Sequence, residues 1–176
     1  DLLHKRFIVF ELDNISENRT LLPVVTIIIM ETFLAKMRRL QGVRKVLLLE
    51  EAWKAIAKEG MASYVKYLYK TVRKYFGEAI VVTQEVEDII SSPIVKESII
   101  NNADCKILLD QRKYRNKFDQ IQTLLGLTDK ERAQVLSINL SNDPARRYKE
   151  VFISLGGVQS AVYATEVSDE EYLVRP

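Results

Sequence analysis

Cysteine and histidine are nearly absent from this sequence of 176 residues, which has one of each, Cys105 and His4. A single cysteine excludes an internal disulfide bond and a zinc site built from several cysteines. A single histidine near the first residue argues against a histidine-containing catalytic triad or a histidine-rich metal site. The lack of a cysteine framework and of a cleavable leader fits a reducing, cytoplasmic compartment.

Long apolar runs and a disorder-promoting composition are missing as well. The most apolar stretch, residues 21–30, is interrupted by Pro23 and Thr26, and it is shorter than the ~20 residues that a membrane-spanning helix needs. Hydrophobic residues make up 47% of the chain and charged residues 28%, which together with the length is typical of a single globular domain. Because the chain begins with Asp1 and not with methionine, we expect sequence upstream of it.

A strong excess of one charge is also lacking. There are 26 basic and 24 acidic residues, which gives a net charge of +2. This balance does not predict a strong overall attraction to nucleic acid. Any basic binding site must therefore be local.

Four short apolar runs have the character of strands buried on both faces of a sheet. They are residues 7–10, 46–49, 79–82 and 107–109. Between them lie segments with helical periodicity that are long enough to connect parallel strands, namely residues 20–40, 61–76 and 86–102, the last with a break at Pro93. This alternation predicts an α/β fold with a mainly parallel sheet flanked by helices.

The last third of the chain predicts a different set of elements. Residues 117–125 and 128–137 have the pattern of two amphipathic helices joined at Gly126. Residues 148–155 and 158–167 alternate apolar and polar side chains around two consecutive glycines, which predicts a carboxyl-terminal β-hairpin. We expect this hairpin to extend the same domain at an edge of its sheet.

Polar residues follow each of the four apolar runs: Glu11 and Asp13, Glu50 and Glu51, Thr83 and Gln84, and finally Asp110, Gln111 and Arg112. In open α/β sheets, ligands bind at the carboxyl ends of the strands. Strands must end in polar residues in any case, so this pattern alone leaves a binding site and an ordinary sheet edge equally open.

The sharpest local signal is KVLLLEEAW, residues 45–53, in which a strand delivers two adjacent carboxylates. This resembles a Walker B motif. There, Glu50 would provide a hard oxygen ligand for Mg²⁺ bound to nucleotide phosphates, and Glu51 would orient or deprotonate the attacking water. The alternative is an exposed acidic pair that is favoured by the dipole of the following helix.

Two weaker signals follow. The run AIVVTQ, residues 79–84, ends in Gln84, whose amide is able to donate to a phosphate oxygen and accept from water, although an ordinary turn residue also explains it. In the helix before this run, Arg73 is a candidate to stabilise charge on the γ-phosphate in a neighbouring subunit, although a basic helix face is usually only solvated. The phosphate-binding pattern G-x-x-x-x-G-K-[ST] is absent among the six glycines.

Together these residues resemble a known family. The stretches LLLEEAWKAIAKEG, YLYKTVRKYFGEAIVVTQEVEDI and IINNADCKILLDQ are similar to the carboxyl-terminal ATPase region of TraG-type conjugative-transposon proteins. These proteins group with the large ATPase of type IV secretion systems and, more distantly, with the HerA and FtsK motors. The similarity runs from about residue 7 to about residue 167.

The resemblance implies a partial RecA-like P-loop NTPase fold without Walker A. It implies ATP hydrolysis with Mg²⁺ in the full-length protein, at the subunit interfaces of a homo-hexamer that works with other conjugation components on the cytoplasmic side of the inner membrane. By position, Glu50 and Glu51 match the Walker B pair, Gln84 matches the sensor glutamine, and Arg73 matches an arginine ahead of that strand. Asn101, Asn102, Asp110 and Gln111 match the stretch that follows.

The chain departs from the family at two points. Its first Walker B position is Glu50 where the family usually has Asp, which favours a water-mediated contact with the metal. It also lacks the P-loop, so we expect that loop upstream and expect the isolated chain to be inactive.

Two other functions remain open. In a DNA-translocating coupling protein, a basic channel would include Lys36, Arg38, Arg39, Arg44 and Lys45. In a non-catalytic interaction module, the missing phosphate loop would reflect a decayed site.

Overall fold

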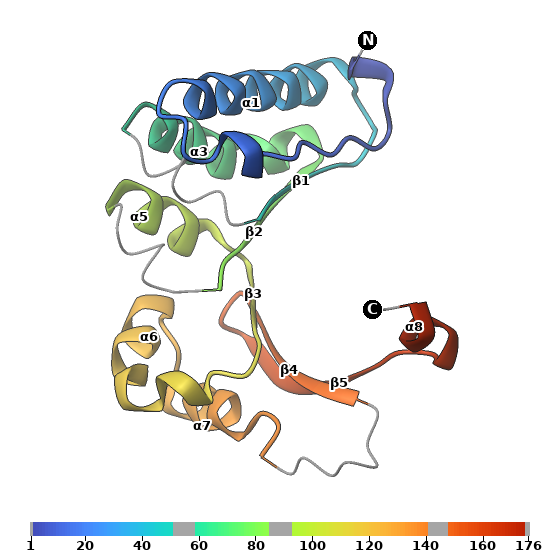
Figure 1. Cartoon of the computed structure of the whole chain (residues 1–176). Helices are drawn as coiled ribbons and strands as arrows, with labels where there is room; N and C mark the ends of the chain where they lie inside the picture. The colour runs from blue at the N-terminus through green and yellow to red at the C-terminus, as the bar shows by residue number, and fades with distance from the viewer. Residues whose placement is uncertain (1, 51–58, 85–92, 141–147, 175–176) are drawn as a thin grey trace. The chain divides into compact units, whose positions relative to one another are not determined.

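The computed structural model describes residues 2–50, 59–84, 93–140 and 148–174. The chain divides into two compact units, residues 1–102 and 103–176, which we call unit 1 and unit 2 (Figure 1). Within the described ranges, no helix has both the length and the apolar character that crossing a bilayer requires. Whether the two units count as one domain stays a prediction.

Unit 1 is built on a parallel pair of strands. Strand β1, Lys45–Glu50, pairs with strand β2, Gly77–Val82, in the register that places Lys45 opposite Gly77 and Glu50 opposite Val82. The connection between them includes helix α3, Glu59–Thr71, and a 3₁₀ helix η3, Val72–Tyr75. Helix α1, Leu21–Arg39, precedes β1, and helix α5, Pro93–Asn102, follows β2.

One face of this sheet is covered by helices. Leu47 and Ala79 pack against a core of α1, α3 and η3, whose buried members are Met30, Phe33, Leu34, Met37, Leu68 and Val72. Leu49 and Val81 pack against Val65 of α3 and Ile99 of α5. Successive side chains of a strand point to opposite faces, so the next residues in each strand point away from these helices. They are more exposed: Val46, Leu48, Ile80 and Val82.

Unit 2 is built on an antiparallel sheet with the order β3-β4-β5. Strand β3 is Cys105–Leu108, and strands β4, Tyr148–Leu155, and β5, Gln159–Glu166, form the hairpin. Gly156 and Gly157 make its turn with φ values of 57° and 67°, which glycine adopts at little cost. The Gly156 N–H donates to the Asp104 carbonyl at 2.6 Å and so joins the turn to the residue before β3.

Helices pack on this antiparallel sheet. A 3₁₀ helix η4, Arg112–Lys117, leads into α6, Phe118–Leu125, and then α7, Asp129–Ser137, which contacts both β4 and β5. The buried core of unit 2 consists of Phe118, Ile121, Leu124, Leu127, Val135, Ile138, Val151 and Phe152. The described residues also form three short elements: η1, Leu2–His4, η2, Asp13–Ile15, and α8, Asp169–Val174.

The predicted α/β class, with parallel strands, flanking helices and a carboxyl-terminal hairpin, is confirmed. Two of the four predicted parallel strands are wrong in detail. Residues 7–10 form no strand in the structure. Their composition is typical of a strand, but no strand among the described residues pairs with them. The run at 107–109 does overlap a strand, β3, but β3 pairs antiparallel with β4 in unit 2, because the long-range partner decides the direction of a strand.

Candidate functional site

Glu50 is the last residue of β1 and is exposed. Its neighbour Leu49 packs towards α3 and α5, so the alternation of a strand directs Glu50 to the face that these helices leave uncovered. The other end of the strand differs, because the Lys45 side chain is buried and its Nζ donates to the Tyr75 carbonyl at 2.7 Å. The strand therefore presents a carboxylate at its carboxyl end only.

Gln84 reaches the same edge of the sheet. It is exposed, lies two residues beyond the end of β2, and follows Val82, the residue that pairs with Glu50. Two residues span at most ~7 Å and neighbouring strands lie ~5 Å apart. The Cα atoms of Glu50 and Gln84 are thus within about 12 Å of each other. The predicted metal ligand and the predicted sensor amide come together at one strand edge.

Arg73 lies at the opposite end of the sheet. It belongs to η3 and is exposed, and its carbonyl accepts from the N–H of Phe76, the residue directly before β2. The length of β1, about 16 Å for five steps of 3.3 Å, separates this end from Glu50. The structure therefore does not bring Arg73 together with Glu50 and Gln84 within one unit.

The remaining candidates are placed as follows. Glu51 lies outside the described residues. Asn101 and Asn102 are the last residues of α5 and are exposed. Asp110 follows β3 in unit 2 and accepts hydrogen bonds from the Arg112 backbone N–H at 3.0 Å and from Arg112 Nε at 2.8 Å. These contacts with Arg112 lower the pKa of Asp110 below its usual value. The carboxylate therefore has a partner within the chain, and its presence after β3 needs no bound ligand to explain it.

The described residues include no group of three or more His, Cys, Asp or Glu side chains that could hold a metal ion. A site that binds Mg²⁺ together with a nucleotide does not need a full set of protein ligands. Mg²⁺ in such sites is held by one or two protein oxygen ligands together with phosphate oxygens and waters. One exposed carboxylate at Glu50 fits that requirement, directly or through a water.

Sequence reasoning missed a polar network in unit 2. Thr128 caps α7, since its hydroxyl accepts from the Glu131 N–H at 3.2 Å, and the Glu131 carboxylate accepts from the Thr128 N–H at 2.9 Å. The same carboxylate accepts from Ser154 Oγ at 3.0 Å. The pattern Thr-x-x-Glu at the start of a helix predicts such a reciprocal cap and was available in the sequence.

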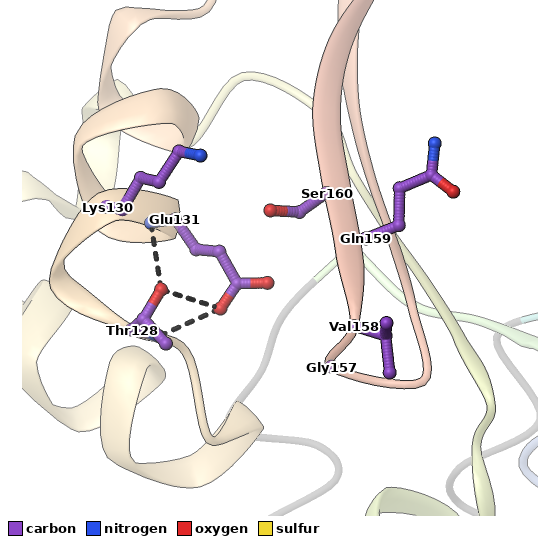
Figure 2. A pocket seen from close by; sticks show the side chains of 7 residues that line it. All are labelled: Thr128, Lys130, Glu131, Gly157, Val158, Gln159 and Ser160. Atoms are coloured by element: carbon purple, nitrogen blue, oxygen red, sulfur yellow. Dashed lines mark hydrogen bonds between the residues drawn. The ribbon is translucent and has the colours of Figure 1, made fainter.

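A shallow pocket of about 340 Å³ opens beside this network. Figure 2 shows the Glu131 carboxylate hydrogen-bonded to Thr128 and directed towards the strand that carries Ser160. Burial by itself raises the pKa of Glu131, but hydrogen bonds from Thr128, Ser154 and Ser160 outweigh it and lower the pKa. Because these bonds link α7 to β4 and β5, we assign the network to stability.

The sequence matches the TraG P-loop domain family over residues 1–175. The chain belongs to this family. It is therefore a member of a P-loop NTPase family, although its own sequence lacks the G-x-x-x-x-G-K-[ST] pattern. No curated protein matches the chain.

The fold of this TraG P-loop domain is similar to a solved structure titled VirB4 of Thermoanaerobacter pseudethanolicus. The two share 23% sequence identity with a TM-score of 0.65, over 94% of this chain and 43% of the VirB4 chain. At this level of identity the similarity establishes the fold alone. The chain spans less than half the length of that relative, so the activity of a whole protein is a matter for proposal.

The basic residues of the DNA-translocation alternative do not line up as one exposed channel in the TraG P-loop domain. Lys45 is buried, as described above. Arg44 pairs with Glu78, Lys36 Nζ donates to the Lys5 carbonyl at 2.5 Å, and Arg38 donates to the Tyr67 hydroxyl at 3.4 Å. Four of the five residues thus have contacts within unit 1.

Proposed function

We propose that this TraG P-loop domain is the carboxyl-terminal part of an ATP-hydrolysing motor of a conjugation or type IV secretion system. The observation that carries the proposal is the parallel register of β1 and β2, which puts Glu50 and Gln84 at one edge of the sheet. Ligands of open parallel sheets bind at this edge. The family match and the VirB4-like fold support the assignment to a secretion ATPase.

Each residue has a separate task in this mechanism. Glu50 would hold Mg²⁺, directly or through a water, and the ion would supply positive charge that stabilises the phosphates of ATP. Glu51 accepts a proton from the attacking water or orients it. The Gln84 amide donates to a γ-phosphate oxygen and accepts from that water. The phosphate cradle itself is expected from a P-loop upstream of Asp1.

Arg73 acts on the nucleotide of a neighbouring copy. The length of β1 keeps it away from Glu50 of its own unit, and its planar fork suits the negative charge that develops on a transferring phosphoryl group. This assignment requires a closed ring of copies, for which we propose a homo-hexamer. We place the ring on the cytoplasmic side of the inner membrane, with other transfer components as partners.

Hydrolysis by a longer protein that includes the upstream P-loop tests the assignment. We expect Glu51→Gln to lower kcat by roughly 10²–10⁴-fold with little change in ATP binding, because general-base catalysis has that size. The matched control is Glu166→Gln, at the exposed end of β5, which should keep full activity. Full activity in the Glu51→Gln protein would remove Glu51 from the mechanism.

Mixed assemblies test the role of Arg73. Arg73→Ala and Glu51→Gln are each expected to be inactive alone. Mixed with Arg73→Ala copies, Glu51→Gln copies supply an intact Arg73 to sites that retain Glu51, so activity should return in part. Hydrolysis that stays absent in every mixing ratio, with assemblies confirmed by mass, would contradict action between copies.

A further inference from the structure

Strand β5 lies at an edge of the antiparallel sheet of unit 2. The sheet has the order β3-β4-β5, and no described strand pairs with the other side of β5. At such an edge, the backbone N–H and C=O groups of the outer side form a template for a further strand. All of β5, Gln159–Glu166, pairs with β4 without a break in register, so this open edge is long and regular.

The composition of β5 does not protect this edge. Natural edge strands are usually blunted by Lys, Pro, a β-bulge or a short length. The sequence QSAVYATE contains no Pro, Lys or Arg, and its single charged residue, Glu166, is its last. The strand at the opposite edge, β3, has four residues and includes Lys106. Strand β5 is therefore the edge of this sheet that favours pairing with another strand.

Tyr163 occupies the middle of β5 on the face that points away from α7. Figure 2 shows Ser160 directed towards this helix, where its hydroxyl donates to the Gln134 side chain at 3.3 Å. Successive side chains of a strand alternate between faces, so Tyr163 lies on the other face, opposite Val151 of β4. Its side chain is 45% exposed. Aromatic residues contribute strongly to contacts between neighbouring strands, and this ring is free to make one.

The residues of β5 are compatible with an antiparallel copy of the same strand. Residues that exchange backbone hydrogen bonds across an antiparallel pair alternate along each strand, so the two-fold axis of two identical strands passes through a residue. With the axis at Tyr163, the two copies of this residue face each other and Val162 faces Ala164. Glu166, the only charge in the strand, then faces Ser160. No like charges oppose the pairing.

We propose that β5 pairs with β5 of a second copy of this chain in an antiparallel, two-fold contact that joins their sheets into one. Main-chain hydrogen bonds hold the edges together, and the two Tyr163 rings add a contact between aromatic side chains. A two-fold contact closes after two copies, whereas the ring proposed above repeats a head-to-tail contact. The two contacts are separate, and this inference does not rest on the proposed function.

Self-association of the 176-residue chain, measured by sedimentation velocity over a range of concentrations, tests the edge. Tyr163→Lys places two like charges next to each other in the contact and should weaken association by about tenfold or more. Because Tyr163 is half-exposed, the thermal midpoint should change little. Leu173→Lys, at an 82% exposed position of α8, adds the same charge outside β5 and should associate as the wild type does, as should Tyr163→Phe.

Mixing opposite charges tests the two-fold symmetry. Tyr163→Glu should associate as weakly as Tyr163→Lys, because each variant meets its own kind with like charges. In an equal mixture, a two-fold contact brings the new Lys and Glu side chains together, so association should recover towards the wild-type level. A head-to-tail contact would not bring position 163 against itself, and recovery therefore distinguishes the two geometries.

A pair of proline variants tests the role of the backbone. The N–H groups of Ala164 and Thr165 point to opposite sides of β5, because neighbouring residues of a strand alternate in this respect. One proline therefore removes a bond to β4 and should lower the thermal midpoint. The other removes only an outward donor, which edge strands tolerate, and should keep the midpoint but abolish association.

Several outcomes would overturn the proposal. A wild-type chain that stays monomeric at the highest soluble concentration, or a Tyr163→Lys chain that associates normally, would contradict it. So would a mixture of the Lys and Glu variants without recovery, or a stable proline variant that still associates. Association that is lost in Arg73→Ala but kept in Tyr163→Lys would assign self-association to the ring contact alone and would leave β5 unpaired.

Discussion

Unit 1 and unit 2 differ in the kind of sheet on which each is built, parallel in unit 1 and antiparallel in unit 2. In unit 2, the buried Glu131 has hydrogen-bond partners in α7 and β4, and the hairpin turn is bonded to the start of β3. In the described part of unit 1, one face of a parallel sheet remains exposed, with Leu48 at 54%, whereas parallel sheets are normally covered on both faces. Unit 1 therefore has an apolar sheet face that its described helices do not cover, whereas an antiparallel sheet such as that of unit 2 is commonly exposed on one face.

The largest expected effect is on the core of unit 2. Phe118→Ala removes a fully buried ring and should lower the free energy of unfolding by about 3–5 kcal/mol. The only tryptophan, Trp53, lies in the range of unit 1, and the only cysteine, Cys105, lies in that of unit 2. Urea unfolding followed by a dye on Cys105 should shift, while unfolding followed by Trp53 fluorescence should not. Equal shifts of both signals would show that the two units unfold together and would contradict a difference in stability between them.

A smaller effect is expected at Glu131, where the comparison predicts a dependence on pH. The lowered pKa of Glu131 means that its carboxylate stabilises the fold above the pKa of an unfolded glutamate, about 4.3, and that this contribution is lost as the pH falls through the folded pKa. Glu131→Gln should cost roughly 1–3 kcal/mol at pH 7. The gap to the wild type should narrow in urea unfolding below about pH 4. An unchanged gap at low pH, with Glu166→Gln as the neutral control, would contradict this role.

The smallest effects concern two neighbours in unit 1 and should have opposite signs. A Cβ at Gly77 would lie 2.8 Å from Val72 Cγ2 and 3.2 Å from the Val72 carbonyl, so Gly77→Ala should destabilise unit 1 by about 1–2 kcal/mol.

Phe76→Gly places a glycine at a left-handed backbone position, which removes a steric cost in the folded state but makes the unfolded chain more flexible. We expect the free energy of unfolding to rise by roughly 0.5 kcal/mol. Trp53 fluorescence in urea measures both, and a loss of stability in Phe76→Gly would show that the ring is supported within the chain.

Local sequence signals predicted those parts of the fold that depend on neighbouring residues. The apolar runs of β1 and β2 and the paired glycines of the hairpin turn gave correct elements, because burial pattern and turn chemistry act over a few residues. The Thr128 cap is equally local and was readable but missed. The run at residues 7–10 has strand composition without strand structure, since a strand also needs a partner from a distant part of the chain.

The candidate site was predicted in the same uneven way. Its residue types and order, Glu50 and Glu51 and then Gln84, follow from the sequence and from its resemblance to a family. Whether Glu50 and Gln84 share an edge depends on the register that pairs Glu50 with Val82. Whether Lys45 belongs to a basic surface depends on its burial against Tyr75. The spacing of these residues in the sequence determines neither the register nor the burial.

The sequence by itself determined the α/β class, the family and the chemistry that the strand ends offer, because these depend on composition, periodicity and motif. Only the tertiary structure decided that Glu50 and Arg73 lie at opposite ends of one sheet, that β3 belongs to an antiparallel sheet, and that β5 lies at an edge of that sheet. The physical reason is that register, strand direction and burial are set by contacts between residues far apart in the chain.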